Sequence, residues 1–190
     1  MHPVPPGSRP GPAEAQRDDE IFDVVNDRDE PVARATRGEV HARRLLHRAV
    51  HVLVFGTDGR VFLQQRSKLK DTSPGLWNSS CSGHLDAGED YDAAAVRELG
   101  EEIGLTVTPA TRLTRLLKLT PCRETGWEFA WIYSARGDGP FTLHPAEVEA
   151  GAWFTRDEVT RALMERPKEF SRAFTYLWPR FLTSGGTGGL

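Results

Sequence analysis

The chain has 190 residues, of which 38% are hydrophobic and 27% are charged, so it is long enough for one domain with a buried core. With a formal net charge of −3, nothing in the composition favours binding to a nucleic-acid backbone, although a local basic pocket for phosphate would not show in this sum. Two cysteines, no apolar run of membrane-spanning length and no signal-peptide core predict a cytoplasmic protein without a disulfide framework or a membrane segment.

The two ends of the chain differ in composition from the rest. Residues 1–18 are rich in Pro, Gly and Ala, and residues 184–190 have the sequence SGGTGGL. Both stretches carry few large apolar residues, so we expect them to be disordered tails. Residues 19–183 are predicted to form a single domain.

A β-hairpin opens this domain. Residues 21–25 (IFDVV) and 31–35 (PVARA) have the composition of strands, and residues 26–29 (NDRD) supply a turn between them.

The elements predicted after the hairpin mix strands and helices. They are a helical turn at 36–41, strands at 48–55 and 60–66, a loop at 67–82, a helix at 90–103, strands at 113–120, 127–135 and 147–154, and helices at 156–164 and 167–181. Pro179 should kink the last helix or end it early. This order predicts an α/β or α+β fold with a mixed sheet.

The helix at 90–103 carries a cluster of acids. Glu98, Glu101 and Glu102 occupy positions i, i+3 and i+4, which places their carboxylates on one helix face. Carboxylates at this spacing repel one another unless a cation lies among them. Because Mg²⁺ and Mn²⁺ prefer oxygen ligands, the pattern predicts a site for one of these ions. A solvated acidic face is the alternative.

Two glycines mark the same helix. Gly104 is a natural left-handed residue at its C-terminal end. Gly100 lies inside the helix, where a glycine costs about 1 kcal/mol relative to alanine. Close packing is the only reason for Gly100 that the sequence suggests.

The stretch GHLDAGEDYDAAAVRELGEEIGL, from Gly83 to Leu105, resembles the Nudix box at every fixed position of the family pattern. The matching residues are Gly83, Glu89, Arg97, Glu98, Leu99, Glu101, Glu102, Gly104 and Leu105. The resemblance implies an α/β/α sandwich with a mixed sheet. It also implies metal-dependent hydrolysis of a nucleoside diphosphate linked to another moiety, or of a similar small-molecule diphosphate.

The same resemblance implies roles for individual residues. The metal ligands would be Glu98, Glu101, Glu102 and the Gly83 carbonyl, and the catalytic set would be Glu98, Glu101, Arg97 and Glu89. Arg97 would orient a glutamate through a bidentate pair, with Glu89 as its expected partner. The proton of the attacking water would pass to Glu98 or to a glutamate from a later loop, for which Glu147 and Glu149 are candidates.

Contacts to the substrate should come from outside the box. The basic candidates are Arg48, Arg66, Lys68 and Lys70, each of which is also typical of an ordinary surface charge. The box does not choose the substrate, and the sequence leaves a homodimer through an edge of the hairpin open.

A second, wider resemblance is to isopentenyl diphosphate isomerase, which has a Nudix-like fold. The residues that carry it are His47, Pro74-Gly75-Leu76-Trp77, Cys81, Ser82, Gly83, His84 and Glu128. It implies a His/Glu metal site, with His41 near the place of a further ligand, and a catalytic cysteine. That cysteine is expected at the position of Ser82, and Cys81 comes one residue earlier, which in a strand turns it to the opposite face.

The intact box favours an isomerase-like branch of the Nudix hydrolases over a true isomerase. A third hypothesis, a non-catalytic nucleotide-binding module, is disfavoured because such modules usually lose box glutamates and this chain has kept all of them.

Overall fold

The computed structural model describes residues 16–184, in which seven strands form one mixed sheet and two more form a separate hairpin. The strands are β1 (Ile21–Val25), β2 (Pro31–Thr36), β3 (His47–Phe55), β4 (Val61–Arg66), β5 (Trp77–Asn78), β6 (Cys81–His84), β7 (Thr114–Leu119), β8 (Glu128–Arg136) and β9 (Val148–Phe154). The helices are α2 (Arg37–Arg43), α3 (Tyr91–Ile103), α4 (Arg156–Glu165) and α5 (Arg172–Thr183), with 3₁₀ turns at Pro109–Thr111 and Pro167–Glu169. The predicted α+β fold with an N-terminal hairpin is confirmed.

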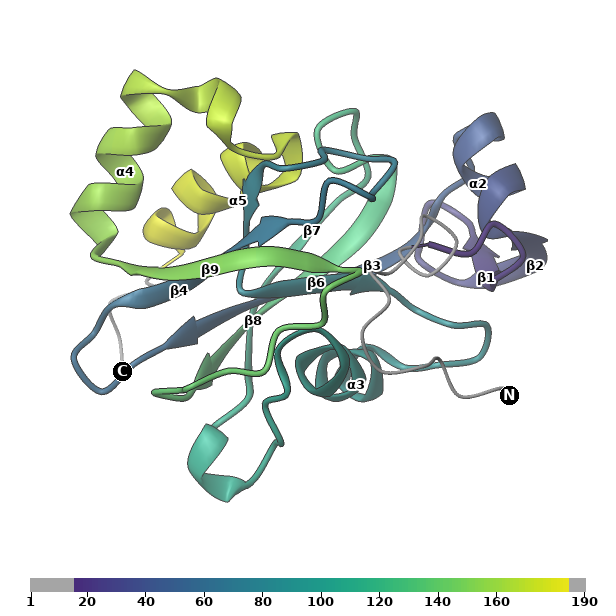
Figure 1. The fold of residues 1–190 in the computed structure, drawn as a ribbon. Coiled ribbons are helices and arrows are strands. Elements are labelled where there is room, and N and C mark those ends of the chain that lie inside the picture. The colour runs from purple at the N-terminus through teal and green to yellow at the C-terminus, as the bar shows by residue number, and fades with distance from the viewer. Residues whose placement is uncertain (1–15, 185–190) are drawn as a thin grey trace.

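The sheet lies between two layers of helix. Its strand order is β5-β4-β3-β8-β7, with β6 paired to β3 and β9 paired to β4. Strands β3 and β8 are parallel, and the other pairs are antiparallel. Figure 1 shows α3 on one side of the sheet and α4 and α5 on the other. Strand β3 is buried along almost its whole length, as a strand covered on both faces should be.

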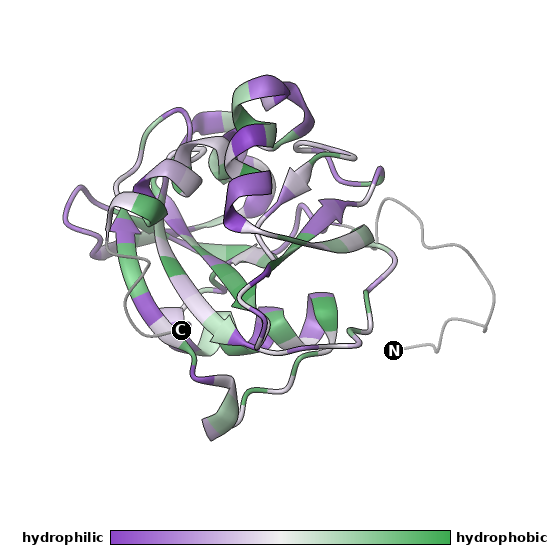
Figure 2. Ribbon diagram, turned by 90° about the vertical axis from the view of Figure 1, so that its left-hand side faces the viewer, coloured by the Kyte–Doolittle hydropathy of each residue, from purple (hydrophilic) through white to green (hydrophobic). Residues whose placement is uncertain are grey.

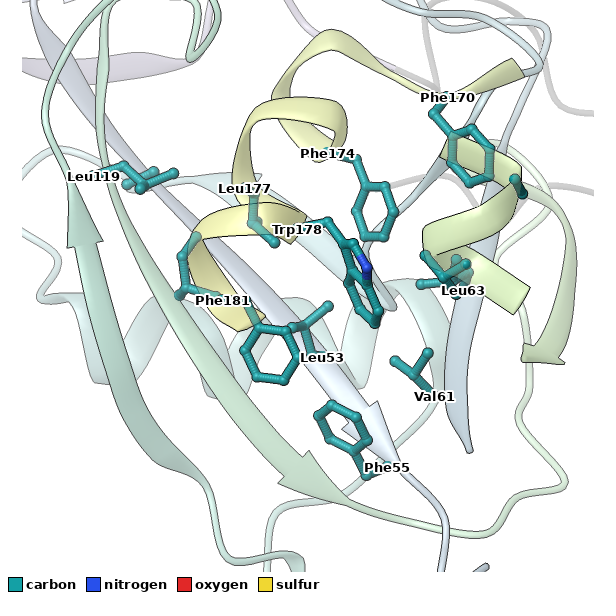
Figure 3. Close-up of a cluster of buried hydrophobic side chains, with 14 of the residues drawn as sticks. Leu53, Phe55, Val61, Leu63, Leu119, Phe170, Phe174, Leu177, Trp178 and Phe181 are labelled. Carbon is teal, nitrogen blue, oxygen red and sulfur yellow. The ribbon is translucent and has the colours of Figure 1, made fainter. Parts of the chain in front are cut away.

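Each face of the sheet has its own hydrophobic core. On one face, Phe174, Trp178 and Phe181 of α5 pack over Leu53 and Leu63 of the sheet (Figure 3). On the other face, α3 covers the alternate residues of β3. The buried apolar residues of this second core include Val50, Val52, Val54, Ala94, Ala95, Leu99 and Ile103.

Helix α3 has clear boundaries. The Asp90 side chain accepts hydrogen bonds from the first turn, and Gly104 ends the helix in the left-handed conformation (φ 68°), as predicted. Figure 2 shows apolar and polar residues alternating along it, in keeping with one face packed on the sheet. Nothing lies within 4 Å of where a Cβ at Gly100 would be, so close packing does not explain this glycine.

The segment predicted as a loop at 67–82 contains strand β5 and the first half of strand β6. Strand β5 pairs with β4, and β6 pairs with β3 from Ala49↔His84 to Val52↔Cys81. Strands this short have no periodicity that a sequence pattern can reveal, and they form because β3 and β4 offer free edges.

The last predicted helix, 167–181, is divided in two. After the 3₁₀ turn, the Ser171 hydroxyl accepts a hydrogen bond from the Phe174 N–H (3.1 Å) and starts α5. The helix continues through Pro179 to Thr183, so the predicted early end is wrong. Phe181, beyond the proline, is buried in the core, and this packing outweighs the one backbone hydrogen bond that proline removes.

Part of the predicted N-terminal tail contacts the domain. Gln16 donates a hydrogen bond to the Leu69 carbonyl, and Asp18 pairs with Arg37 at 2.9 Å, so residues 16–18 contact the domain. The rest of the predicted tails, residues 1–15 and 185–190, lies outside the described residues. Between residues 16 and 184, no helix combines the length and the apolar character needed to cross a membrane.

Candidate functional site

A cleft of about 870 Å³ is lined by residues of α2, β3, β6, α3 and β8, and by the start of α5. The sequence-predicted residues that line it are His41, Arg66, Lys70, Gly83, His84, Arg97, Glu98, Glu101, Glu102, Glu128 and Glu147. His47 and Glu89 do not line it and contact residues that do. The cleft therefore brings the box glutamates and the histidine motif to one place.

Two of the predicted substrate-binding residues lie elsewhere. Arg48 donates to Asp29 at 2.6 Å and so ties the turn of the hairpin to β3. Lys68 is 76% exposed and lies 3.9 Å from Glu149. Neither side chain lines the cleft, because each is directed to a carboxylate outside it, so the structure does not support a substrate-binding role for them.

The acid end of the cleft consists of Glu98, Glu101 and Glu102. The Glu98 carboxylate lies directly over Gly83 of β6, where a Cβ would be 1.9 Å from its Oε1 atom and 2.1 Å from its Cδ atom. Only glycine leaves this space free. The glycine of the box is thus explained by the position of a carboxylate against the strand backbone.

Arg97 holds the acid end together. Its guanidinium donates two hydrogen bonds of 2.9 Å to the two oxygens of Glu89, which confirms the predicted bidentate pair. It also donates to Glu98 at 2.7 Å, to Glu101 at 3.0 Å and to the His84 carbonyl at 3.0 Å. One side chain therefore fixes three box carboxylates and the backbone of β6.

Glu102 is oriented from the side of the sheet. Its Oε2 atom accepts a hydrogen bond of 2.9 Å from the Ser82 N–H and another of 2.9 Å from Gln64 Nε2. Within the part of the chain that the structure describes, no hydrogen bond reaches its Oε1 atom. One oxygen is thus held in place and the other is left for a ligand.

The acid end is short of positive charge. Burial, together with the charge of Glu102, raises the pKa of Glu98 to about 8, and burial, together with Glu147, raises the pKa of Glu102 to about 7. A divalent cation would favour the ionised forms. Because carboxylate oxygens are the ligands that Mg²⁺ and Mn²⁺ prefer, the residues of the acid end fit such an ion.

The histidine end of the cleft consists of His41, His47, His84 and Glu128. The ligand atoms of the three histidines lie within 4.8 Å of one another. Glu128 Oε1 is 3.1 Å from His84 Nε2 and 3.4 Å from His47 Nε2. Because four different elements (α2, β3, β6 and β8) each supply one residue, the cluster exists only in the folded chain.

Two atoms of the histidine end are buried without a partner. His47 Nδ1 is 2.9 Å from the Leu45 carbonyl, which can only accept, so Nδ1 carries a proton, and His47 Nε2 is buried without a hydrogen-bond partner, 3.4 Å from Glu128 Oε1. His41 Nε2 is also buried and unpaired. Burial lowers the pKa of His84 to about 4 and lowers the pKa of His41. Neutral imidazoles beside a carboxylate fit a cation such as Zn²⁺ or Mn²⁺.

Comparison with known proteins agrees with this geometry. The family model described as the NUDIX domain matches residues 45–174. The chain belongs to the Nudix family. Residues 45–174 include the whole acid end, and His47, His84 and Glu128 of the histidine end.

The relatives of this Nudix protein include proteins named for two activities. It is 31% identical to the Nudix hydrolase YfcD of Escherichia coli (strain K12) over 160 residues, which cover 84% of this chain and 86% of YfcD. It is 33% identical to the isopentenyl-diphosphate Delta-isomerase of Pectobacterium atrosepticum over 162 residues, 83% of this chain and 88% of the isomerase.

The fold is shared with solved structures. The crystal structure of DR0079 from Deinococcus radiodurans matches with a TM-score of 0.75 at 24% identity and covers 85% of this chain and 98% of that one. The Nudix domain of Shewanella oneidensis NrtR, solved with ADP ribose, matches with a TM-score of 0.56 at 21% identity, over 78% of this chain and 98% of that domain.

Cys81 does not belong to the site of this Nudix protein. Its side chain is fully buried in the core beneath α3, on the face of β6 opposite to His84. Burial raises the pKa of its thiol well above the ordinary value. The cleft is lined instead by Ser82, so the cysteine proposed for an isomerase-like site is absent from it.

Several residues of this Nudix site were not predicted from the sequence. They are Gln64, His51, Asn78, Ser79, Ser82 as a cleft residue, and Ser171. His51 and Gln64 did carry a signal, since each is a polar residue inside a strand that is otherwise mostly apolar. The serines and Asn78 carried none, because their short strands are set by tertiary pairing.

Proposed function

We propose that this protein hydrolyses the phosphoanhydride bond of a small-molecule diphosphate, typically a nucleoside diphosphate linked to another group, with Mg²⁺ or Mn²⁺ at the acid end. The observation that supports this most strongly is the seating of Glu98 over Gly83, beside an oriented Glu102, in one cleft. The same cleft extends beyond the acid end, where it is lined by His41, His51 and His84.

The proposed chemistry assigns a task to each residue of the acid end. A bound divalent cation would neutralise phosphate oxygens and acidify the attacking water. Glu98, Glu101 and Glu102 would bind the cation, and Arg97 keeps Glu98 and Glu101 in place. The water oxygen bonds to phosphorus while the bridging P–O bond breaks and its electron pair leaves with the departing phosphate. The water proton passes to Glu98 or to Glu147.

Replacing Glu102 tests the acid end. The Glu102→Gln variant removes a charge but keeps the hydrogen-bond acceptor for Ser82 and Gln64, so we expect it to fold. Release of phosphate or nucleoside monophosphate should fall by about 10³-fold or more, since electrostatic groups of this kind contribute several kcal/mol to transition-state stabilisation. The assay is product release from a panel of diphosphates with Mg²⁺ and Mn²⁺.

Glu149→Gln is the matched control, because this candidate base lies outside the cleft, 44% exposed and 3.9 Å from Lys68. Its activity should equal that of the unmodified protein. If Glu102→Gln retained a near-native rate, or if no diphosphate of a broad panel were cleaved, the proposed hydrolase function would be wrong.

The histidine end favours a second candidate, isomerisation of isopentenyl diphosphate. The isomerase resemblance implies a His/Glu metal site there, and relatives carry that name. Against it stands Ser82, which replaces the expected cysteine at the cleft. Conversion of isopentenyl diphosphate to its double-bond isomer without release of phosphate would support this function. We expect the unmodified protein to show no such conversion, and Ser82→Cys tests whether the thiol is the missing group.

A further inference from the structure

We propose that His51 and Ser82 form a subsite that holds a hydroxyl-bearing group, such as a sugar, attached to the diphosphate of the substrate. The inference rests on the proposed function for its diphosphate, but it concerns the other end of the ligand. Both residues line the cleft, and they lie directly opposite each other on β3 and β6.

The neighbours of His51 determine where its proton lies. Ser79 Oγ is 3.2 Å from the Cys81 carbonyl, which can only accept, so the single hydroxyl proton of Ser79 is used there. We therefore assign His51 Nδ1, 2.8 Å from the same Oγ atom, as the donor. Because burial lowers the pKa of His51 to about 4, the ring is neutral and its Nε2 atom is a bare acceptor.

This acceptor has no partner in the protein. No hydrogen bond to His51 Nε2 is formed within residues 16–184, although His51 is only 6% exposed. The atom is not among the fully enclosed unpaired atoms, which are His41 Nε2, His47 Nε2 and Gln64 Oε1. It therefore keeps access to the cleft that His51 lines.

The neighbours of Ser82 leave a donor free. Ser171, the N-terminal cap of α5, accepts from the Phe174 N–H and donates to Asn78 Oδ1 at 2.9 Å. This fixes the amide of Asn78, whose Nδ2 donates to Ser82 Oγ at 2.9 Å. The Ser82 hydroxyl is thus used as an acceptor, and its own proton has no acceptor in the described part of the chain.

An acceptor and a donor therefore stand side by side on the floor of the cleft. Directly opposed residues of antiparallel strands have Cβ atoms about 5 Å apart, so one small group can reach both. A hydroxyl both donates and accepts, and matches the pair. A phosphate oxygen would be repelled by bare Nε2, and a hydrocarbon chain would leave both groups unpaired, which is unfavourable in a buried site.

The location suits the far end of a diphosphate ligand. Ser82 belongs to the subsite, and its backbone N–H donates a hydrogen bond to Glu102. The subsite therefore adjoins the acid end. Ala49, between His47 and His51 on β3, is small and lines the cleft. A ligand with its diphosphate over the box glutamates can thus place its hydroxylated group against Ser82 and His51.

Calorimetry with three ligands tests the subsite. They are UDP-glucose, which carries sugar hydroxyls, isopentenyl diphosphate, whose extra group is a hydrocarbon, and inorganic pyrophosphate, which has no extra group. With Ca²⁺ as the divalent ion, we expect the unmodified protein to bind UDP-glucose more tightly than isopentenyl diphosphate. His51→Phe should weaken UDP-glucose binding by about tenfold or more and leave pyrophosphate binding within about twofold, since a buried polar partner is lost for one ligand only.

Three comparisons keep this test decisive. His51→Gln retains an acceptor and should recover part of the lost affinity, and Ser82→Ala should reproduce the loss of His51→Phe. In ¹⁵N NMR spectra, His51 should show a protonated Nδ1 and a bare Nε2, and the Nε2 signal should shift with UDP-glucose but not with pyrophosphate. Thermal melting checks that each variant is folded.

Failure of this inference differs from failure of the proposed hydrolysis. Binding that depends on His51 without cleavage would support the subsite and contradict the hydrolase. Cleavage of sugar diphosphates with an unchanged KM in folded His51→Phe would support the hydrolase and overturn the subsite. Equal losses for UDP-glucose and pyrophosphate, or tighter binding of isopentenyl diphosphate by the unmodified protein, would also overturn it.

Discussion

Burial shifts pKa values at both the acid end and the histidine end of the cleft, but in opposite directions. Both bury titratable side chains, and burial favours their uncharged forms. For Glu98 and Glu102 this raises the pKa to about 8 and about 7, so a cation must displace protons to bind. For His84 it lowers the pKa to about 4, which leaves the neutral imidazole that a metal ion binds.

The two ends are also joined in different ways to the rest of the fold. The acid end belongs to one helix and is held by Arg97, Gln64 and the Ser82 N–H, whereas the histidine end is assembled from four elements. Arg97 connects them, because it binds Glu98 and also the carbonyl of His84. A local motif and a dispersed cluster thus share a cleft, and we expect them to respond differently to mutation and to pH.

Gly83→Ala should have the largest effect and should act on the acid end alone. The new methyl group would lie 1.9 Å from Glu98 Oε1, so the carboxylate has to leave its place over β6. If hydrolysis depends on Glu98, product release in Mg²⁺ should fall by about 10³-fold, in line with the loss of a preorganised electrostatic group.

The histidine end supplies the control for this variant. Side chains alternate along β6, so that of His84 points away from the face that Glu98 occupies. Binding of Co²⁺, followed by its visible absorption, should therefore be within about threefold of the unmodified protein. Loss of Co²⁺ binding together with activity would show that the two ends cannot be separated in this way.

The acid end could be predicted from the sequence because its information is local. The spacing of Glu98, Glu101 and Glu102 fixes their common face on any helix, and the Arg97–Glu89 pair follows from the same helix and its preceding loop. The predicted strands and the N-terminal hairpin were likewise set by composition within short windows. For these features, whose neighbours lie within about ten residues, the sequence pattern was sufficient.

The remainder needed the three-dimensional structure. Arg48 and Lys68 are basic residues near the right strands, yet their carboxylate partners, Asp29 and Glu149, draw them away from the cleft. Strands β5 and β6 exist because of the edges of β3 and β4. The hydrogen-bond chain from Ser171 to Ser82 joins residues far apart in sequence. No single-sequence pattern encodes such long-range pairings.

Arg97→Lys tests the connection between the two ends. Lysine keeps the charge but cannot make the bidentate bonds to Glu89 or bind Glu98 and the His84 carbonyl at the same time. We expect hydrolysis to fall by about 10- to 100-fold, the range typical for residues that hydrogen-bond to metal ligands and orient them. Steady-state kinetics should show the loss mainly in kcat. A rate equal to that of the unmodified protein would mean that the guanidinium geometry is unimportant.

The pH dependence of metal binding should separate the ends most directly. At pH 6 the raised pKa values of Glu98 and Glu102 keep both carboxyls largely protonated, so Mg²⁺ affinity should rise by up to about tenfold per pH unit for each proton displaced, up to about pH 8. His84, with its pKa of about 4, is already neutral at pH 6, so Co²⁺ affinity at the histidine end should change much less over this range.

Calorimetry in two buffers of different ionisation enthalpy would count the protons released at each end. Glu102→Gln should reduce the number released by Mg²⁺, and His84→Gln should abolish Co²⁺ binding without changing Mg²⁺ binding. Parallel pH profiles for the two ions would contradict the distinction between the ends.

Gly100→Ala should have the smallest effect and the opposite sign. Gly100 lies within α3 between Glu98 and Glu102, but it is exposed, and a Cβ there would meet nothing within 4 Å. Alanine in a helix is favoured over glycine by about 1 kcal/mol, so the melting temperature should rise by about 2–4 °C. Product release should stay unchanged, because the residue touches neither end. A fall in activity would show that the box needs flexibility in the helix itself, and the acid end would then be more than a rigid arrangement of carboxylates.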